Sequence, residues 1–106
     1  MGKIVIAAFR PKSDMEEELK RVIASRLPLL RRLGMATDRV NITMRTVNGT
    51  ILDVSEWTDD DAIARAHETP EVLDLWKRFE ECSEYVKLES MDEIRQEFAT
   101  FEAVTL

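Results

Sequence analysis

The pattern of hydrophobic and polar positions predicts three strands in the first half of the chain. Residues 3–9 form an almost continuous apolar run, which suits a strand that is buried on both faces. Residues 40–47 and 50–57 alternate and are rich in β-branched side chains, so each stretch predicts a strand. Between them stands Asn48-Gly49, a pair that type I′ turns favour, which predicts an antiparallel hairpin.

A two-residue turn would also fix the register of this hairpin. Asn41 would then lie opposite Glu56, and Thr43 would lie opposite Val54. In that register each face of the hairpin mixes apolar and polar side chains. Two helices can cover only one side of such a sheet, so we expect a second copy of the chain to cover the other side as a homodimer.

The hydrophobic period changes to that of a helix in two other stretches. Apolar residues recur three or four positions apart over residues 13–33, where Ser13 and Glu16 have the spacing of a capping box. A second helical block follows residue 57 in two pieces. We expect Thr58 to cap the first piece and Thr69-Pro70 to begin the second.

The last quarter of the chain leaves two candidates for the final strand. Residues 84–89 alternate briefly, and residues 98–104 have the composition of a strand and look like the last one. The element order is then β-α-β-β-α-β, which is the ferredoxin-like order. The sequence therefore predicts a single α+β domain over residues 1–106, with an antiparallel four-stranded sheet.

Charge and cysteine content narrow the partners and the compartment. A net charge of -6 argues against nucleic acid or an anionic membrane as a partner. The single cysteine, Cys82, cannot form an intrachain disulfide, so we expect a reducing, cytoplasmic location. With one histidine and no CxxC or HExxH motif, the sequence predicts no metal site.

Residues 57–70 read W-T-D-D-D-A-I-A-R-A-H-E-T-P, and they begin at the last residue of a strand that ends in Glu56-Trp57. This pattern resembles the dimeric α+β-barrel superfamily, and most closely its antibiotic-biosynthesis-monooxygenase-like domains. The resemblance implies two sheets packed into a shared barrel across a homodimer, with a small aromatic or hydrophobic ligand between each sheet and its helices. The heme-degrading branch has an asparagine on the first strand, which residues 3–9 lack, and a ligating histidine at the position of Lys77. We therefore expect no cofactor.

Two residues are the candidates for catalysis. His67 is the candidate general base, because an unperturbed imidazole titrates near neutral pH. The alternative is a helix histidine that bonds a neighbour at the rim of a pocket. Glu56 is the candidate that orients His67. Its alternative role is a carboxylate at a strand end that pairs with Arg45 or Arg65.

Four further residues are candidates for binding a substrate: Trp57, Asn41, Arg45 and Tyr85. Trp57 would form a pocket wall against an aromatic ligand, or else belong to the core or an interface. Arg45 would bind an anionic group of the ligand, or else be an exposed charge of the hairpin.

These residues leave two hypotheses for function. One is a cofactor-independent monooxygenase or isomerase that acts on a small aromatic or enolisable compound. The other is a non-catalytic dimeric module that binds a ligand or another protein. The position of His67 distinguishes them, since a general base must face an open cavity and have a polar partner.

Overall fold

The structure is a computed structural model that describes residues 2–106. Strands and helices alternate along the chain much as the hydrophobic pattern predicts. They are, in order, β1 (Lys3–Pro11), α1 (Glu16–Arg32), β2 (Ile42–Arg45), β3 (Ile51–Trp57), α2 (Asp60–Ala66), α3 (Pro70–Cys82), β4 (Ser83–Tyr85), the 3₁₀ turns η1 (Leu88–Ser90) and η2 (Asp92–Arg95), and β5 (Glu102–Ala103).

The sheet is antiparallel and has the strand order β4-β1-β3-β2-β5. The order of its first four strands is compatible with a ferredoxin-like fold, so the α+β prediction is confirmed at that level. The predicted number of four strands is wrong, because both candidates for the final strand contribute one. β4 adds to the edge beside β1, and β5 adds to the opposite edge beside β2.

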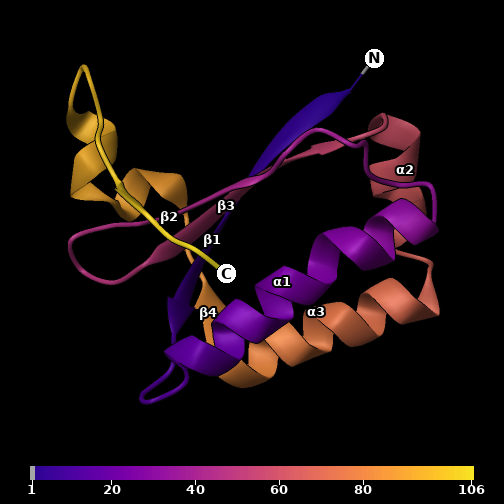
Figure 1. Cartoon of the computed structure of the whole chain (residues 1–106), viewed down its shortest axis with the longest axis horizontal. Helices are drawn as coiled ribbons and strands as arrows, with labels where there is room; N and C mark the ends of the chain where they lie inside the picture. Colours follow the sequence, from indigo (N-terminus) through magenta and orange to yellow (C-terminus); the bar gives the residue numbers. More distant parts are fainter. Residues whose placement is uncertain (1) are drawn as a thin grey trace.

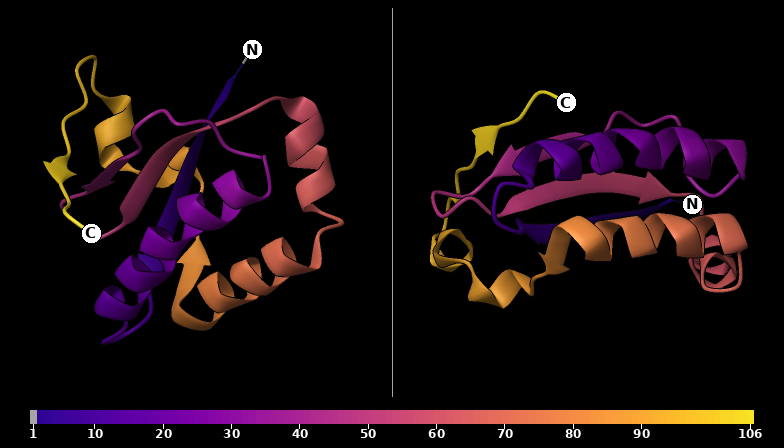
Figure 2. Two further views of the ribbon diagram at one scale, coloured as in Figure 1. Left: turned by 45° about the vertical axis from the view of Figure 1, so that its right-hand side comes forward. Right: turned by 90° about the horizontal axis from the view of Figure 1, so that it is seen from below.

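The two long helices, α1 and α3, lie side by side on one face of the sheet (Figures 1 and 2). Their apolar stripes pack on the inward residues of β1 and β3, where Phe9 stacks on Phe79 with ring centroids 4.4 Å apart. The C-terminal segment, residues 86–106, lies at the hairpin end of the sheet (Figure 1). It packs Met91 and Phe101 against Ala8 and Leu52 on the opposite, outer face.

The register of the β2–β3 hairpin differs by one residue from the prediction. The loop has three residues, because Thr46 and Thr50 close it through the Thr46 N–H and the Thr50 carbonyl, 2.9 Å apart. Gly49 supplies the required positive φ of 90°. A shift of one residue moves every side chain of a strand to the other face. Thr43 therefore lies opposite Asp53 rather than Val54.

The corrected register determines which residues of β2 and β3 share a face of the sheet. The inward face of the hairpin carries the polar residues Thr43, Asp53 and Ser55 beneath α1. The outer face carries the apolar residues Ile42, Met44, Leu52 and Val54, with Glu56 at the end of β3. Each face of the hairpin still mixes apolar and polar residues, as predicted, but the residues that share a face differ from the prediction.

The helix boundaries also differ in detail. Met15 rather than Ser13 precedes α1, and it makes no side-chain cap, so the predicted capping box is wrong. Asp59 rather than Thr58 caps α2, since its carboxylate accepts the Ala62 N–H at 2.8 Å. The predicted start of α3 at Thr69-Pro70 is confirmed.

Candidate functional site

The structure places His67 on the surface, at the C-terminal end of α2. The residue before it, Ala66, is fully buried, and the next position on a helix turns about 100° away. The imidazole packs edge-on against Trp76, with ring centroids 5.0 Å apart. His67 therefore does not lie on the inward stripe of its helix.

Glu56 lies on the outer face of β3. Its Oε1 accepts a hydrogen bond from the Thr37 hydroxyl at 2.7 Å and pairs with Arg39 Nε at 3.2 Å. These two partners hold the pKa of the Glu56 carboxyl below its usual range. Among residues 2–106 no hydrogen bond or ion pair joins Glu56 to His67, and the arginine that pairs with Glu56 is neither Arg45 nor Arg65.

Arg45 and Tyr85 have structural partners. The Arg45 guanidinium contacts the carboxylates of Glu16 and Glu102, each at 3.0 Å, and so ties β2 to α1 and to β5. Tyr85 is exposed on β4, packs against Phe9, and donates its hydroxyl hydrogen to the Trp76 carbonyl at 3.4 Å. Partial burial of the phenol raises the pKa of Tyr85.

A buried polar cluster lies between the sheet and α1, and we name it the polar centre. It consists of Arg26, Asn41, Thr43, Asp53 and Ser55. Arg26 Nη1 donates to Asp53 Oδ2 at 2.9 Å and to Ser55 Oγ at 3.0 Å. The other oxygen of Asp53 accepts from the Asn41 amide at 2.9 Å and from the Thr43 hydroxyl at 3.0 Å. Three donors, from Arg26, Asn41 and Thr43, therefore surround a carboxylate that is 0% exposed.

Trp57 adjoins the polar centre. The Arg26 guanidinium carbon lies 5.9 Å from the centroid of its ring, which is cation–π geometry. The side chain is buried, and its indole Nε1 has no hydrogen-bond partner among residues 2–106. Burial lowers the pKa of Arg26, and Asp53 opposes that shift. The guanidinium stays cationic at neutral pH, so it and the indole N–H both offer donors.

Two of the six predicted site residues, Asn41 and Trp57, belong to this region, and the other four lie elsewhere. Sequence reasoning missed Arg26 and Asp53. Arg26 lies on the apolar stripe of α1, at helical spacing from Val22 and Leu30. A charged residue on that stripe was the sequence feature that could have predicted a buried polar cluster. A charged residue at an inward helix position needs a buried partner of opposite charge.

The chain was compared with known protein families, curated proteins and solved structures. No protein-family model, curated protein or solved structure matches the chain. The resemblance to dimeric α+β-barrel proteins therefore depends on the sequence pattern alone.

Within residues 2–106, no group of three or more His, Cys, Asp or Glu side chains could hold a metal ion. None of the helices in this range has the length and apolar character needed to cross a membrane.

Proposed function

We propose that the chain is a small-molecule-binding protein whose ligand lies at the polar centre, between the sheet and α1. The observation that carries this proposal is the buried indole N–H of Trp57, which has no acceptor among residues 2–106. An unsatisfied buried donor costs about 1–3 kcal/mol, and an oxygen atom of a ligand would remove that cost. Arg26 supplies further N–H donors beside it.

The chemistry of the polar centre favours a planar ligand with a carbonyl or phenolic oxygen. The Trp57 ring offers a flat aromatic surface, and its N–H donates only. Asp53 already neutralises Arg26, so the ligand need carry no full charge. Small aromatic or enolisable compounds, which the sequence resemblance implies, have these features.

Thermal shift assays with 1-naphthol and naphthoquinone test the proposal, since a ligand that binds the native state raises its melting temperature. Trp57→Phe keeps an aromatic ring but removes the N–H, so it should abolish the shift. The matched control is Trp76→Phe, because Trp76 lies outside the polar centre beside His67. No shift in the wild type, or an equal shift in Trp57→Phe, would argue against this ligand site.

We also propose that the functional unit is a homodimer that forms through the outer face of the sheet. The C-terminal segment covers only the part of this face near Ala8 and Leu52. Ile4 and Ile42 are 55% and 60% exposed on the remaining part, and Ile6 is also exposed. A second copy presents the same apolar surface, which suits an isologous interface.

Cofactor-independent oxidation or isomerisation with His67 as the base stays a prediction from the resemblance. The imidazole is exposed and packs on Trp76, so catalysis has less support than binding. Oxygen uptake on addition of 1-naphthol, lost in His67→Ala, would favour the enzyme over the binding module.

A further inference from the structure

Two neighbouring hollows lie along the seam between the tip of the β2–β3 hairpin and the C-terminal segment. Their volumes are about 270 and 170 Å³, and they share Val47, Glu93 and Thr100. The larger hollow is also lined by Asn48, Asp92 and Gln96. Since drug-sized ligands occupy about 300–1,000 Å³, this seam suits a smaller molecule or a single head group.

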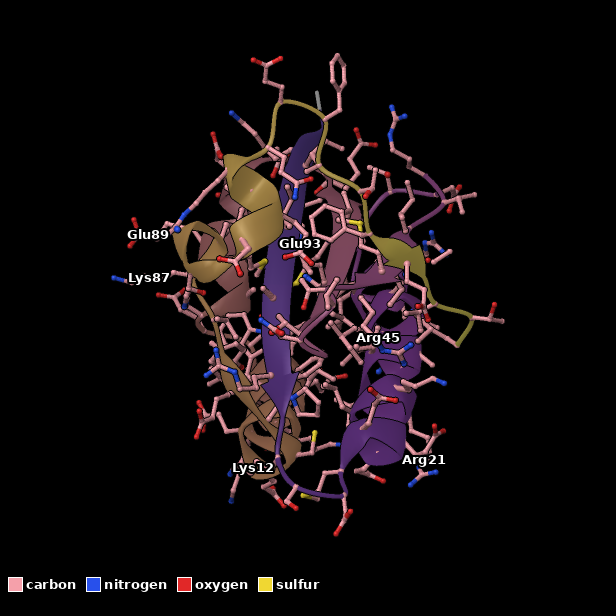
Figure 3. All side chains as sticks on the ribbon, turned by 90° about the vertical axis from the view of Figure 1, so that its left-hand side faces the viewer. Lys12, Arg21, Arg45, Lys87, Glu89 and Glu93 are labelled. Atoms are coloured by element: carbon pink, nitrogen blue, oxygen red, sulfur yellow. The ribbon has the colours of Figure 1, made fainter. Side chains whose placement is uncertain are left out.

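Glu93 is the central residue of this seam. Its side chain is 8% exposed, and it points from η2 toward the strands, whereas Glu89 points away from the molecule (Figure 3). Glu93 Oε2 accepts the backbone N–H of Val47 at 2.9 Å. Within residues 2–106, Oε1 has no hydrogen-bond partner, and no lysine or arginine forms an ion pair with this carboxylate.

The groups around Glu93 add negative charge and hydrogen-bond acceptors. Asp92 contributes a second carboxylate to the larger hollow, and Asn48 contributes an amide oxygen. The cation at the smaller hollow is Arg45, which already contacts the carboxylates of Glu16 and Glu102. Glu93 is therefore a buried residue whose carboxylate has no cation of its own among residues 2–106 and whose Oε1 is open to the hollows.

We infer that this seam binds a small organic cation, with an ammonium or guanidinium group on the free oxygen of Glu93. Buried carboxylates in proteins are normally paired, because an isolated charge is costly to remove from water. A charge-assisted hydrogen bond from an N–H donor would satisfy Oε1, and the neighbouring Asn48 and Thr100 oxygens can accept the other hydrogens. This site is separate from the polar centre and does not depend on it.

Titration with agmatine, followed by the amide NMR signals of Val47 and Asn48, tests this inference. Glu93→Gln retains an oxygen for the Val47 N–H but removes the charge, so it should weaken agmatine binding at least about tenfold. Glu89→Gln is the matched control, because it changes the net charge equally at an exposed site outside the seam. It should bind agmatine like the wild type.

Titration with a capped Gly-Arg-Gly peptide shows whether the cation is a free small molecule or an arginine side chain of a protein. Tighter binding of agmatine indicates the small molecule, and tighter binding of the peptide indicates the side chain. Signals that do not move with either probe would overturn the inference. Equal weakening in Glu93→Gln and Glu89→Gln would also overturn it, because that result indicates unspecific attraction. If Glu93→Gln does not fold, Asp92→Asn at the exposed rim should still weaken agmatine binding, and unchanged binding there would count against the site.

Discussion

Arg26 and Asp53 form a direct ion pair in the core, with Nη1 and Oδ2 2.9 Å apart and both side chains almost completely buried. Such a pair is a weak source of net stability, because removing both charges from water offsets most of their attraction. The loss of one partner is different, since it leaves the other charge buried and unpaired. At the scale of single residues, the polar centre is therefore the most sensitive place in the molecule.

Asp53→Asn should lower the free energy of unfolding by about 3–5 kcal/mol, because it leaves the charge of Arg26 buried without a partner of opposite charge. Urea unfolding measures this loss. Asp61→Asn is the control, since it breaks an exposed pair with Arg65 and should cost less than about 1 kcal/mol. The double variant Arg26→Met, Asp53→Leu should recover much of the stability, and equal losses in Asp53→Asn and Asp61→Asn would contradict the buried pair.

Glu56 should make stability depend on pH in the acid range. Its folded-state pKa is lowered by Thr37 and Arg39, so its contribution is present above the unfolded-state pKa of about 4.3 and is lost as pH falls through the folded-state pKa. Melting temperatures across the acid range should therefore fall less steeply in Glu56→Gln than in the wild type. Identical slopes would show that the Thr37 and Arg39 contacts do not lower this pKa.

At the scale of elements, α1 contains an internal proline. The helix continues through Pro28 to Arg32, although proline has no N–H to offer the Ala24 carbonyl. Pro28 is exposed, so its ring has no role in the core. The helix forms despite this residue because its other face buries the apolar stripe that includes Leu27 and Leu30.

Pro28→Ala should stabilise the protein by about 1–2 kcal/mol, because it restores one helical hydrogen bond and removes a poor helix former. Thermal or urea unfolding measures the gain. Pro70→Ala is the matched control, because Pro70 occupies the first turn of α3, where proline is favoured, and should bring no gain. A loss of stability in Pro28→Ala would show that the proline itself contributes to the packing of α1.

At the scale of the whole molecule, the two faces of the sheet are covered to different extents. Two helices bury its inner face, and the C-terminal segment buries only part of its outer face. Ile4 and Ile6 on β1, and Ile42 on β2, remain exposed on that outer face, on the two strands that flank β3. The proposed homodimer would bury them.

Sedimentation at micromolar concentration should give roughly twice the 12.3 kDa mass of one chain. The double variant Ile6→Glu, Ile42→Glu should be monomeric, because a dimer would bury its unpaired carboxylates. Leu73→Glu serves as the control, since it adds the same charge at an exposed position on α3 and should remain dimeric. A monomeric wild type would contradict the proposed interface.

The sequence by itself determined which segments are strands and helices. The apolar run of β1, the alternation in β3 and the helical spacing of α1 and α3 each depend on local periodicity, which a single chain displays directly. The Thr69-Pro70 helix start follows from local backbone chemistry in the same way. The α+β class was predictable for these reasons.

Only the tertiary structure decided the faces of the elements and the residues of the site. Asn48-Gly49 is compatible with loops of two or three residues, and the choice between them decided which residues of β2 share a face with which residues of β3. That choice placed Thr43 opposite Asp53, and the packing of α1 on the sheet brought Arg26 to Asp53, 27 positions apart in the chain. It was not visible locally, because register depends on burying apolar area and pairing charges across the whole fold.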